Sequence, residues 1–147
     1  MKSLQFVTDE GYNVYIPLFS GNTILLGNNG TGKSYVYEAL KKASSERKLK
    51  FDCACFDNNN CTAMLHTLNS DYKGLIVLEN FDILRVNYPE LIPLLQEQSH
   101  QVLLIGRCVD NIPRHMFYVF ELVRKGRNIG VKALVSPVEF YKGDYML

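Results

Sequence analysis

The chain has 147 residues, a hydrophobic share of 47%, a charged share of 21% and a formal net charge of +1. This length and composition suit one ordinary globular domain, so we expect a single unit over residues 1–147. The near-zero charge provides no overall field toward nucleic acid or a membrane surface. No apolar run reaches the ~20 residues of a membrane span, and acidic residues precede any apolar core at the N-terminus, so we expect no signal peptide and a cytoplasmic protein.

The first half of the chain predicts a hairpin, a buried strand, a helix and a further strand. Residues 4–8 and 12–18 alternate around a polar turn, which is typical of a β-hairpin. Residues 23–27, "TILLG", read as a short buried strand. Apolar residues from Ser34 to about Arg47 share one helical face. Residues 49–57 follow as a second strand in the same βα pattern.

The second half continues the alternation of strands and helices. Its expected elements are a helix at 61–70, strands at 74–82 and 101–107 separated by a helix at 88–98, and a hairpin from 116–123 and 129–135. Closely spaced alternation predicts βαβ units, a parallel sheet and helices on both of its faces. We therefore expect an α/β fold, a three-layer αβα core with a mainly parallel sheet and antiparallel hairpins at the N- and C-terminal ends.

One stretch, "GNNGTGKS" from Gly27 to Ser34, fits the pattern G-x-x-x-x-G-K-[S/T] at every fixed position. Phosphate oxygens need several N–H donors that converge on one point, and only glycine-rich backbone curls that tightly. The lysine would place an ammonium on the β and γ phosphates, and the serine hydroxyl would coordinate Mg²⁺. The residues expected to contact the nucleotide are Gly27, Asn28, Asn29, Gly30, Thr31, Gly32, Lys33, Ser34 and Tyr35.

This stretch resembles the Walker A element of P-loop NTPases, in the form G-x-N-G-x-G-K-S of ABC, SMC and related ATPases. The preceding hairpin, which ends in "SGNTILLG", resembles the antiparallel strands that lead into the P-loop of those ATPases. The resemblance covers about residues 22–107, and only the Walker A element is highly specific. It implies a P-loop NTPase core that binds ATP with Mg²⁺.

A second acidic site is expected on the strand "LIVLENFD", residues 75–82, which resembles a degenerate Walker B element. Glu79 stands where Asp is usual and, together with Ser34, would hold the metal. Asn80 stands where many related ATPases place a catalytic Glu, and an amide cannot accept a proton from water. Asp82 would then orient the water in its place. Alternatively, these are polar residues that face solvent at a strand end.

The strand at 101–107 follows the acid strand directly and ends in Arg107. With a full strand–helix unit at 48–70, this arrangement resembles the additional-strand branch of P-loop proteins, which includes AAA+ and STAND ATPases. There the tip of this strand carries a polar sensor of the γ-phosphate, a role that would fall to Arg107. The alternative is a surface arginine.

Several parts of these families are absent from the sequence. It contains no LSGGQ-like signature, no length for SMC coiled coils and no helical AAA+ lid, so the chain is a bare core or a reduced relative. A zinc site is a weaker hypothesis, because the spacing of Cys53, Cys55, Cys61 and His66 fits no structural zinc pattern well. Free thiols are expected instead.

Three functions remain open from the sequence. The first is a Mg²⁺-dependent ATPase in which Lys33, Glu79, Asn80, Asp82 and Arg107 carry the chemistry. The second is a nucleotide-binding switch or scaffold with little turnover, and the third is a small-molecule kinase with Asp57 as base. ATP is preferred because the N/T-K-x-D element of guanine readers is absent. The expected partner is the nucleotide, with a protein partner or homodimer open, no membrane, and no indication of nucleic acid.

Overall fold

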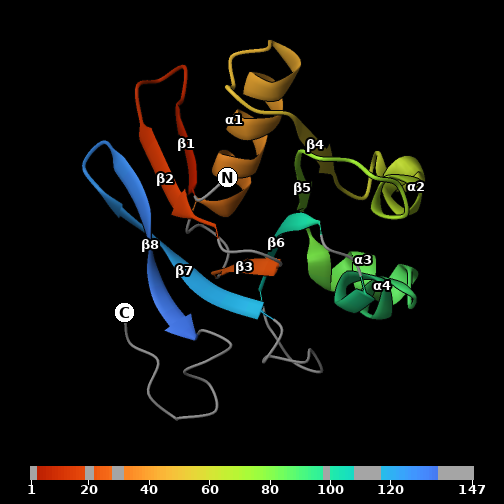
Figure 1. The fold of residues 1–147 in the computed structure, drawn as a ribbon. Helices are drawn as coiled ribbons and strands as arrows, with labels where there is room; N and C mark the ends of the chain where they lie inside the picture. The colour runs from red at the N-terminus through yellow and green to blue at the C-terminus, as the bar shows by residue number, and fades with distance from the viewer. Residues whose placement is uncertain (1–2, 19–21, 28–31, 98–99, 108–116, 136–147) are drawn as a thin grey trace.

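The computed structural model describes residues 3–18, 22–27, 32–97, 100–107 and 117–135 of the chain (Figure 1). The strands in these ranges are β1 Ser3–Val7, β2 Asn13–Pro17, β3 Asn22–Leu26, β4 Cys53–Phe56, β5 Leu75–Leu78, β6 Gln101–Gly106, β7 Phe117–Lys125 and β8 Asn128–Val135. The helices are α1 Lys33–Ser45, η1 Cys61–Ala63 (a 3-10 turn), α2 Met64–Leu68, α3 Phe81–Asn87 and α4 Leu91–Glu97. Within the described ranges, none of the helices has the length and apolar character needed to cross a membrane.

The eight strands form one sheet in the order β1-β2-β8-β7-β3-β6-β5-β4. Neighbours from β7 to β4 run parallel, whereas β7 pairs with β8 and β1 pairs with β2 in the antiparallel sense. A parallel pair joins β2 to β8. Because parallel strands end at the same edge of a sheet, the carboxyl ends of β3, β6, β5 and β4 meet at one edge.

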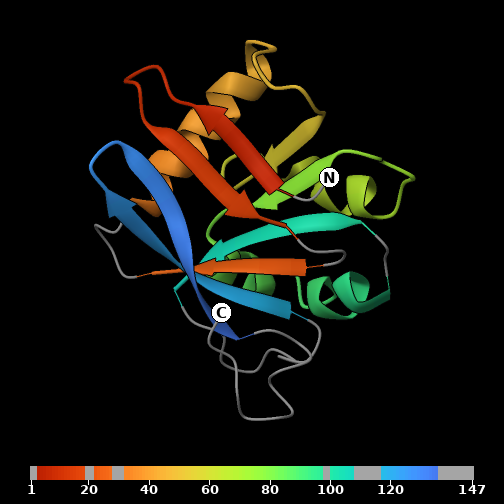
Figure 2. The same cartoon turned by 60° about the vertical axis from the view of Figure 1, so that its left-hand side comes forward.

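The expected three-layer αβα P-loop core with a mainly parallel sheet is wrong. The sheet is mixed and curls into a half-barrel, and four short helices accompany it (Figures 1 and 2). The C-terminal hairpin does not form an edge, because β7 lies beside the central strand β3 and β8 continues the sheet to β2. Strand twist accumulates across eight strands, and a bulge between Val119 and Phe120 adds local coiling, so the sheet does not form a flat middle layer.

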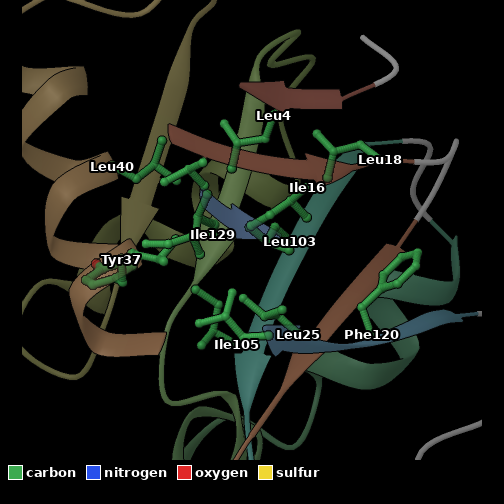
Figure 3. Close-up of a cluster of buried hydrophobic side chains, with 14 of the residues drawn as sticks. Leu4, Ile16, Leu18, Leu25, Tyr37, Leu40, Leu103, Ile105, Phe120 and Ile129 are labelled. Carbon is green, nitrogen blue, oxygen red and sulfur yellow. The ribbon is translucent and has the colours of Figure 1, made fainter. Parts of the chain in front are cut away.

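Apolar side chains pack on both surfaces of the curled sheet. One cluster joins α1 to the sheet and to the N-terminal hairpin, and in Figure 3 Tyr37 and Leu40 of α1 point toward the strands that carry Leu103 and Ile129. A second cluster joins α2, α3 and α4 to the other surface. All four residues of β5 are buried, as expected for a parallel strand covered on both sides. The helix α1 and the continuous buried strands therefore hold the carboxyl-end edge of the sheet in place.

The local elements agree with the sequence pattern except after β5. The helix predicted from Ser34 to about Arg47 is confirmed as α1. The predicted strand at 74–82 ends early, because β5 stops at Leu78 and the short helix α3 begins at Phe81. Asn80 turns the chain between them, with φ 56° and ψ 47°. The predicted strand therefore included Glu79 and Asn80, which connect β5 to α3, and the first two residues of α3.

Candidate functional site

The glycine-rich corner lies between β3, which ends at Leu26, and α1, which begins at Lys33. Gly27 and Gly32 are described, whereas the expected contacts Asn28, Asn29, Gly30 and Thr31 lie outside the described residues. Gly32 has φ 99°, a conformation in which any L side chain is strained, so glycine is required before α1. No side chain among the described residues caps α1, which leaves its first-turn N–H groups directed at the corner.

Lys33 is the most informative side chain of this corner. It is only 9% exposed, and its ammonium donates hydrogen bonds to the carbonyl oxygens of Gly27 and, at 3.1 Å, Gly106. Burial lowers the pKa of Lys33 below its ordinary value and Arg107 lowers it further, whereas the Asp82 and Glu79 carboxylates act in the opposite direction. The ammonium therefore lies between the ends of the neighbouring strands β3 and β6, with two carboxylates in its field.

Glu79 follows the last residue of β5, and its side chain is half-buried. Its backbone N–H donates to the carbonyl oxygen of Phe56 at 2.9 Å, which continues the pairing of β5 with β4. Burial raises the pKa of Glu79, as do Asp57 and Glu38, while Lys33 opposes the rise. Glu79 is thus placed at the same edge of the sheet as Lys33, separated from β3 by the strand β6.

Asn80 has a conformational reason to be asparagine. Its left-handed backbone begins α3, and its carbonyl oxygen accepts hydrogen bonds from the N–H groups of Ile83 and Leu84 at 3.0 Å. Asparagine tolerates this region better than residues with other β-carbon substituents. Because the side chain is exposed, nothing in its packing calls for an amide rather than a carboxylate. The role expected of it in orienting water stays a prediction.

Asp82 and Arg107 meet at the end of β6. The backbone N–H of Arg107 donates to Oδ2 of Asp82 at 2.6 Å, and a β-carbon at Gly106 would lie only 3.0 Å from the same oxygen. Asp82 therefore stabilises the end of β6. At this end the Gly106 carbonyl oxygen accepts a hydrogen bond from Lys33. The side chain of Arg107 is exposed, and its positive charge lowers the pKa of Lys33. Its role as a phosphate sensor stays a prediction.

Tyr35, another expected nucleotide contact, packs against the N-terminal hairpin in this structure. Its hydroxyl contacts Oγ1 of Thr8 at 2.9 Å and the carboxylate of Glu10, and its ring meets that of Tyr12 edge-on at 5.7 Å. These partners belong to the turn of the β1–β2 hairpin. Tyr35 therefore attaches the N-terminal hairpin to the first turn of α1, a contact that the sequence pattern did not indicate.

The described residues fit the two metal hypotheses, a zinc site and a Mg²⁺ site, to different degrees. No group of three or more His, Cys, Asp or Glu side chains in the described ranges is placed to hold a metal ion. The zinc hypothesis is wrong, because Cys53 and Cys55 pack with the cluster under α1 while Cys61 packs with the other cluster. For Mg²⁺, the hydroxyl of Ser34 and the carboxylate of Glu79 are oxygen donors of the kind that this ion prefers.

Sequence reasoning missed one group beside the site. The carboxylate of Asp57, just beyond β4, accepts hydrogen bonds from Tyr37 and Lys41 of α1. The spacing of Tyr37 and Lys41 by four residues, on one face of the predicted helix, was the available signal. It did not identify the partner, which is 16 to 20 residues away along the chain.

Comparisons with known proteins do not identify the chain. No protein-family model matches the sequence, and no curated protein matches it either. A function for this corner must therefore come from its own residues and their geometry.

Proposed function

We propose that the corner formed by Gly27, Gly32, Lys33, Ser34, Glu79 and Gly106 binds a nucleoside triphosphate, ATP by preference, together with Mg²⁺. The observation that carries the proposal is the environment of Lys33. Its buried ammonium is held by two neutral carbonyl oxygens, and within the described residues it forms no ion pair with a carboxylate. A buried charge without a direct ion pair is costly, and a polyphosphate at the start of α1 would supply that ion pair.

The strand order gives independent support. β6 lies between β3 and β5, so one additional strand separates the glycine-rich corner from the acid strand. This is the feature for which the additional-strand branch of P-loop proteins, resembled by the sequence, is named. In that arrangement Lys33 would neutralise phosphate charge, and Ser34 and Glu79 would be the oxygen ligands of Mg²⁺. The metal would supply charge neutralisation at the phosphates when bound.

Hydrolysis is the second candidate function, and it is favoured by the half-buried Glu79 carboxylate in the field of Lys33. The residue that follows it is an exposed amide, Asn80, and the nearby Asp82 carboxylate accepts from a backbone N–H. We therefore propose slow turnover, as in a nucleotide-dependent switch. Phosphoryl transfer to a small molecule is not proposed, because Tyr37, Lys41 and the Asn59 N–H already occupy the carboxylate of Asp57.

The test is titration of the protein with a fluorescent ATP analogue, with and without Mg²⁺. Lys33→Ala should weaken binding by about tenfold to a hundredfold, the value of a charge-assisted contact. Lys42→Ala is the matched control, since Lys42 lies on the same helix and pairs with Asp9 at the surface. Equal affinities of these two variants would contradict the proposal.

Phosphate release by the same proteins measures turnover separately. We expect a wild-type rate well below the ~1 s⁻¹ lower end of ordinary enzyme turnover. Glu79→Gln should weaken the dependence of binding on Mg²⁺ without removing binding itself. A wild-type rate typical of an active ATPase would leave the binding proposal intact and replace the switch with a working enzyme.

A further inference from the structure

Three side chains join the helix α1 to the end of β4. Oδ2 of Asp57 accepts hydrogen bonds from the Tyr37 hydroxyl at 2.7 Å and the Lys41 ammonium at 3.3 Å. Asp57 is 6% exposed and Tyr37 is 1% exposed, so the hydrogen bond between these two side chains is formed away from water. We call Asp57, Tyr37 and Lys41 the α1 clamp. It is the contact by which the second turn of α1 is fixed to the carboxyl-end edge of the sheet.

The strand side of the α1 clamp is rigidly held. The side chain of Asn60 accepts from the Asp57 N–H at 2.7 Å and donates to the Cys55 carbonyl oxygen at 3.0 Å. Phe56 pairs with Leu78 in the sheet, and the Phe56 carbonyl oxygen accepts from the Glu79 N–H. Asp57 and Glu79 are therefore the equivalent next residues on two hydrogen-bonded neighbouring strands.

The helix side of the α1 clamp lies one turn from the glycine-rich corner. Tyr37 follows Lys33 by four residues, so the two side chains lie on the same face of α1. The remaining contacts of α1 with the sheet are mainly apolar and non-directional, whereas a hydrogen bond constrains both a distance and an angle. A hydrogen bond at Tyr37 therefore limits how far the first turn of α1 can move relative to β4 and β5.

Asp57 itself is not arranged to react. Burial opposes its ionisation, yet hydrogen bonds from Tyr37, the Asn59 N–H and Lys41 outweigh burial and lower the pKa of Asp57 below its ordinary value. Burial and the adjacent carboxylate raise the pKa of Tyr37 well above its ordinary range, so its hydroxyl remains a donor. Both groups are thus fixed in the protonation states that keep the contact.

We propose that the α1 clamp is a positioning device that sets Lys33 and Ser34, on the first turn of α1, against Glu79 at the end of β5. This inference rests on the proposed nucleotide function, because it concerns the geometry of that site. Asp57 would act through α1 and touch neither nucleotide nor metal. A misplacement of site groups by about 1 Å can cost as much as a hundredfold in function, so loosening this contact should have a measurable effect.

The test compares two single hydroxyl deletions on the same helix. Tyr37→Phe removes the hydroxyl from the α1 clamp and keeps the buried ring. Ser44→Ala removes a different hydrogen bond, which joins α1 to β4 from Ser44 Oγ to the Cys53 carbonyl oxygen at 2.9 Å, at the far end of the strand. Each variant would be melted thermally and titrated with the fluorescent ATP analogue in Mg²⁺, and phosphate release would give KM and kcat.

We expect both variants to lose a similar amount of thermal stability, while Tyr37→Phe alone weakens Mg²⁺-dependent nucleotide binding by about tenfold. Tyr37→Phe combined with Asp57→Asn should bind nucleotide no more weakly than the more affected single variant, since both changes act on the Tyr37–Asp57 hydrogen bond. If Tyr37→Phe binds as well as Ser44→Ala, the clamp has only a structural role and the inference is overturned. Failure of wild type to bind, or no effect of Lys33→Ala, would instead overturn the proposed function and the clamp with it.

Discussion

The left-handed conformation of Asn80 predicts how this position responds to substitution. A residue with a β-carbon at φ 56° and ψ 47° is destabilised by roughly 1–2 kcal/mol relative to glycine, and asparagine is destabilised less than alanine. Asn80→Ala should therefore lower the free energy of unfolding by about 1 kcal/mol relative to Asn80→Gly. For a chain of this size, that difference corresponds to about 2–4 °C in the unfolding midpoint.

Thermal and urea unfolding of the two variants measure this difference directly. The side chain of Asn80 is exposed, so loss of packing does not complicate the comparison. Asn80→Glu should lower the free energy of unfolding by an amount similar to Asn80→Ala, and it places a carboxylate directly after Glu79. Faster phosphate release from Asn80→Glu would then show that the amide limits turnover. Equal unfolding midpoints for the alanine and glycine variants would refute the conformational explanation.

Three further predictions concern stability. Thr23→Val should raise the free energy of unfolding by about 1 kcal/mol in urea titrations, because Oγ1 of the buried Thr23 has no hydrogen-bond partner in the described part of the chain; a loss would mean that the hydroxyl is satisfied. Arg47→Gly should raise the free energy of unfolding by about 0.5 kcal/mol, since Arg47 lies just beyond the end of α1 with φ 57°. Asp57 has a lowered pKa, so its stabilisation is present above the unfolded value of about 3.9 and is lost as pH falls below it. Asp57→Asn should therefore be less stable than wild type at pH 7 and should lose less stability on acidification.

Local sequence patterns were sufficient to predict the elements that form the corner. The helical periodicity after Ser34 predicted α1, and the continuous apolar runs predicted β5 and β6. The glycines and Lys33 could be matched to a motif because the turn proposed there imposes residue types at fixed local spacing. These features depend on neighbours within a few residues, which is the range over which a sequence pattern is informative.

The sheet could not be predicted in the same way, because strand partners are chosen over long distances. The hairpin signal at 125–128 is local, but nothing in the apolar pattern of β7 indicates that its other edge pairs with β3. That pairing moves the C-terminal hairpin from an edge to the middle of the sheet, and the accumulated twist then curls the sheet. The Asp57–Tyr37 contact was missed for a related reason, since it joins two elements whose relative position follows from the sheet.

The contact between Lys33 and Gly106 predicts a response at β6 when nucleotide binds. A phosphate that draws the Lys33 ammonium toward itself competes with the Gly106 carbonyl oxygen, now 3.1 Å away. The next N–H, that of Arg107, is held by Asp82 at 2.6 Å, so a shift of Gly106 should alter this hydrogen bond too. Hydrogen–deuterium exchange across residues 100–107 should therefore change when Mg²⁺ and ATP are added. Lys33→Ala should abolish the change and Lys42→Ala should keep it. Unaltered exchange in a protein shown to bind ATP would mean that the lysine keeps its bond to Gly106 in the bound state.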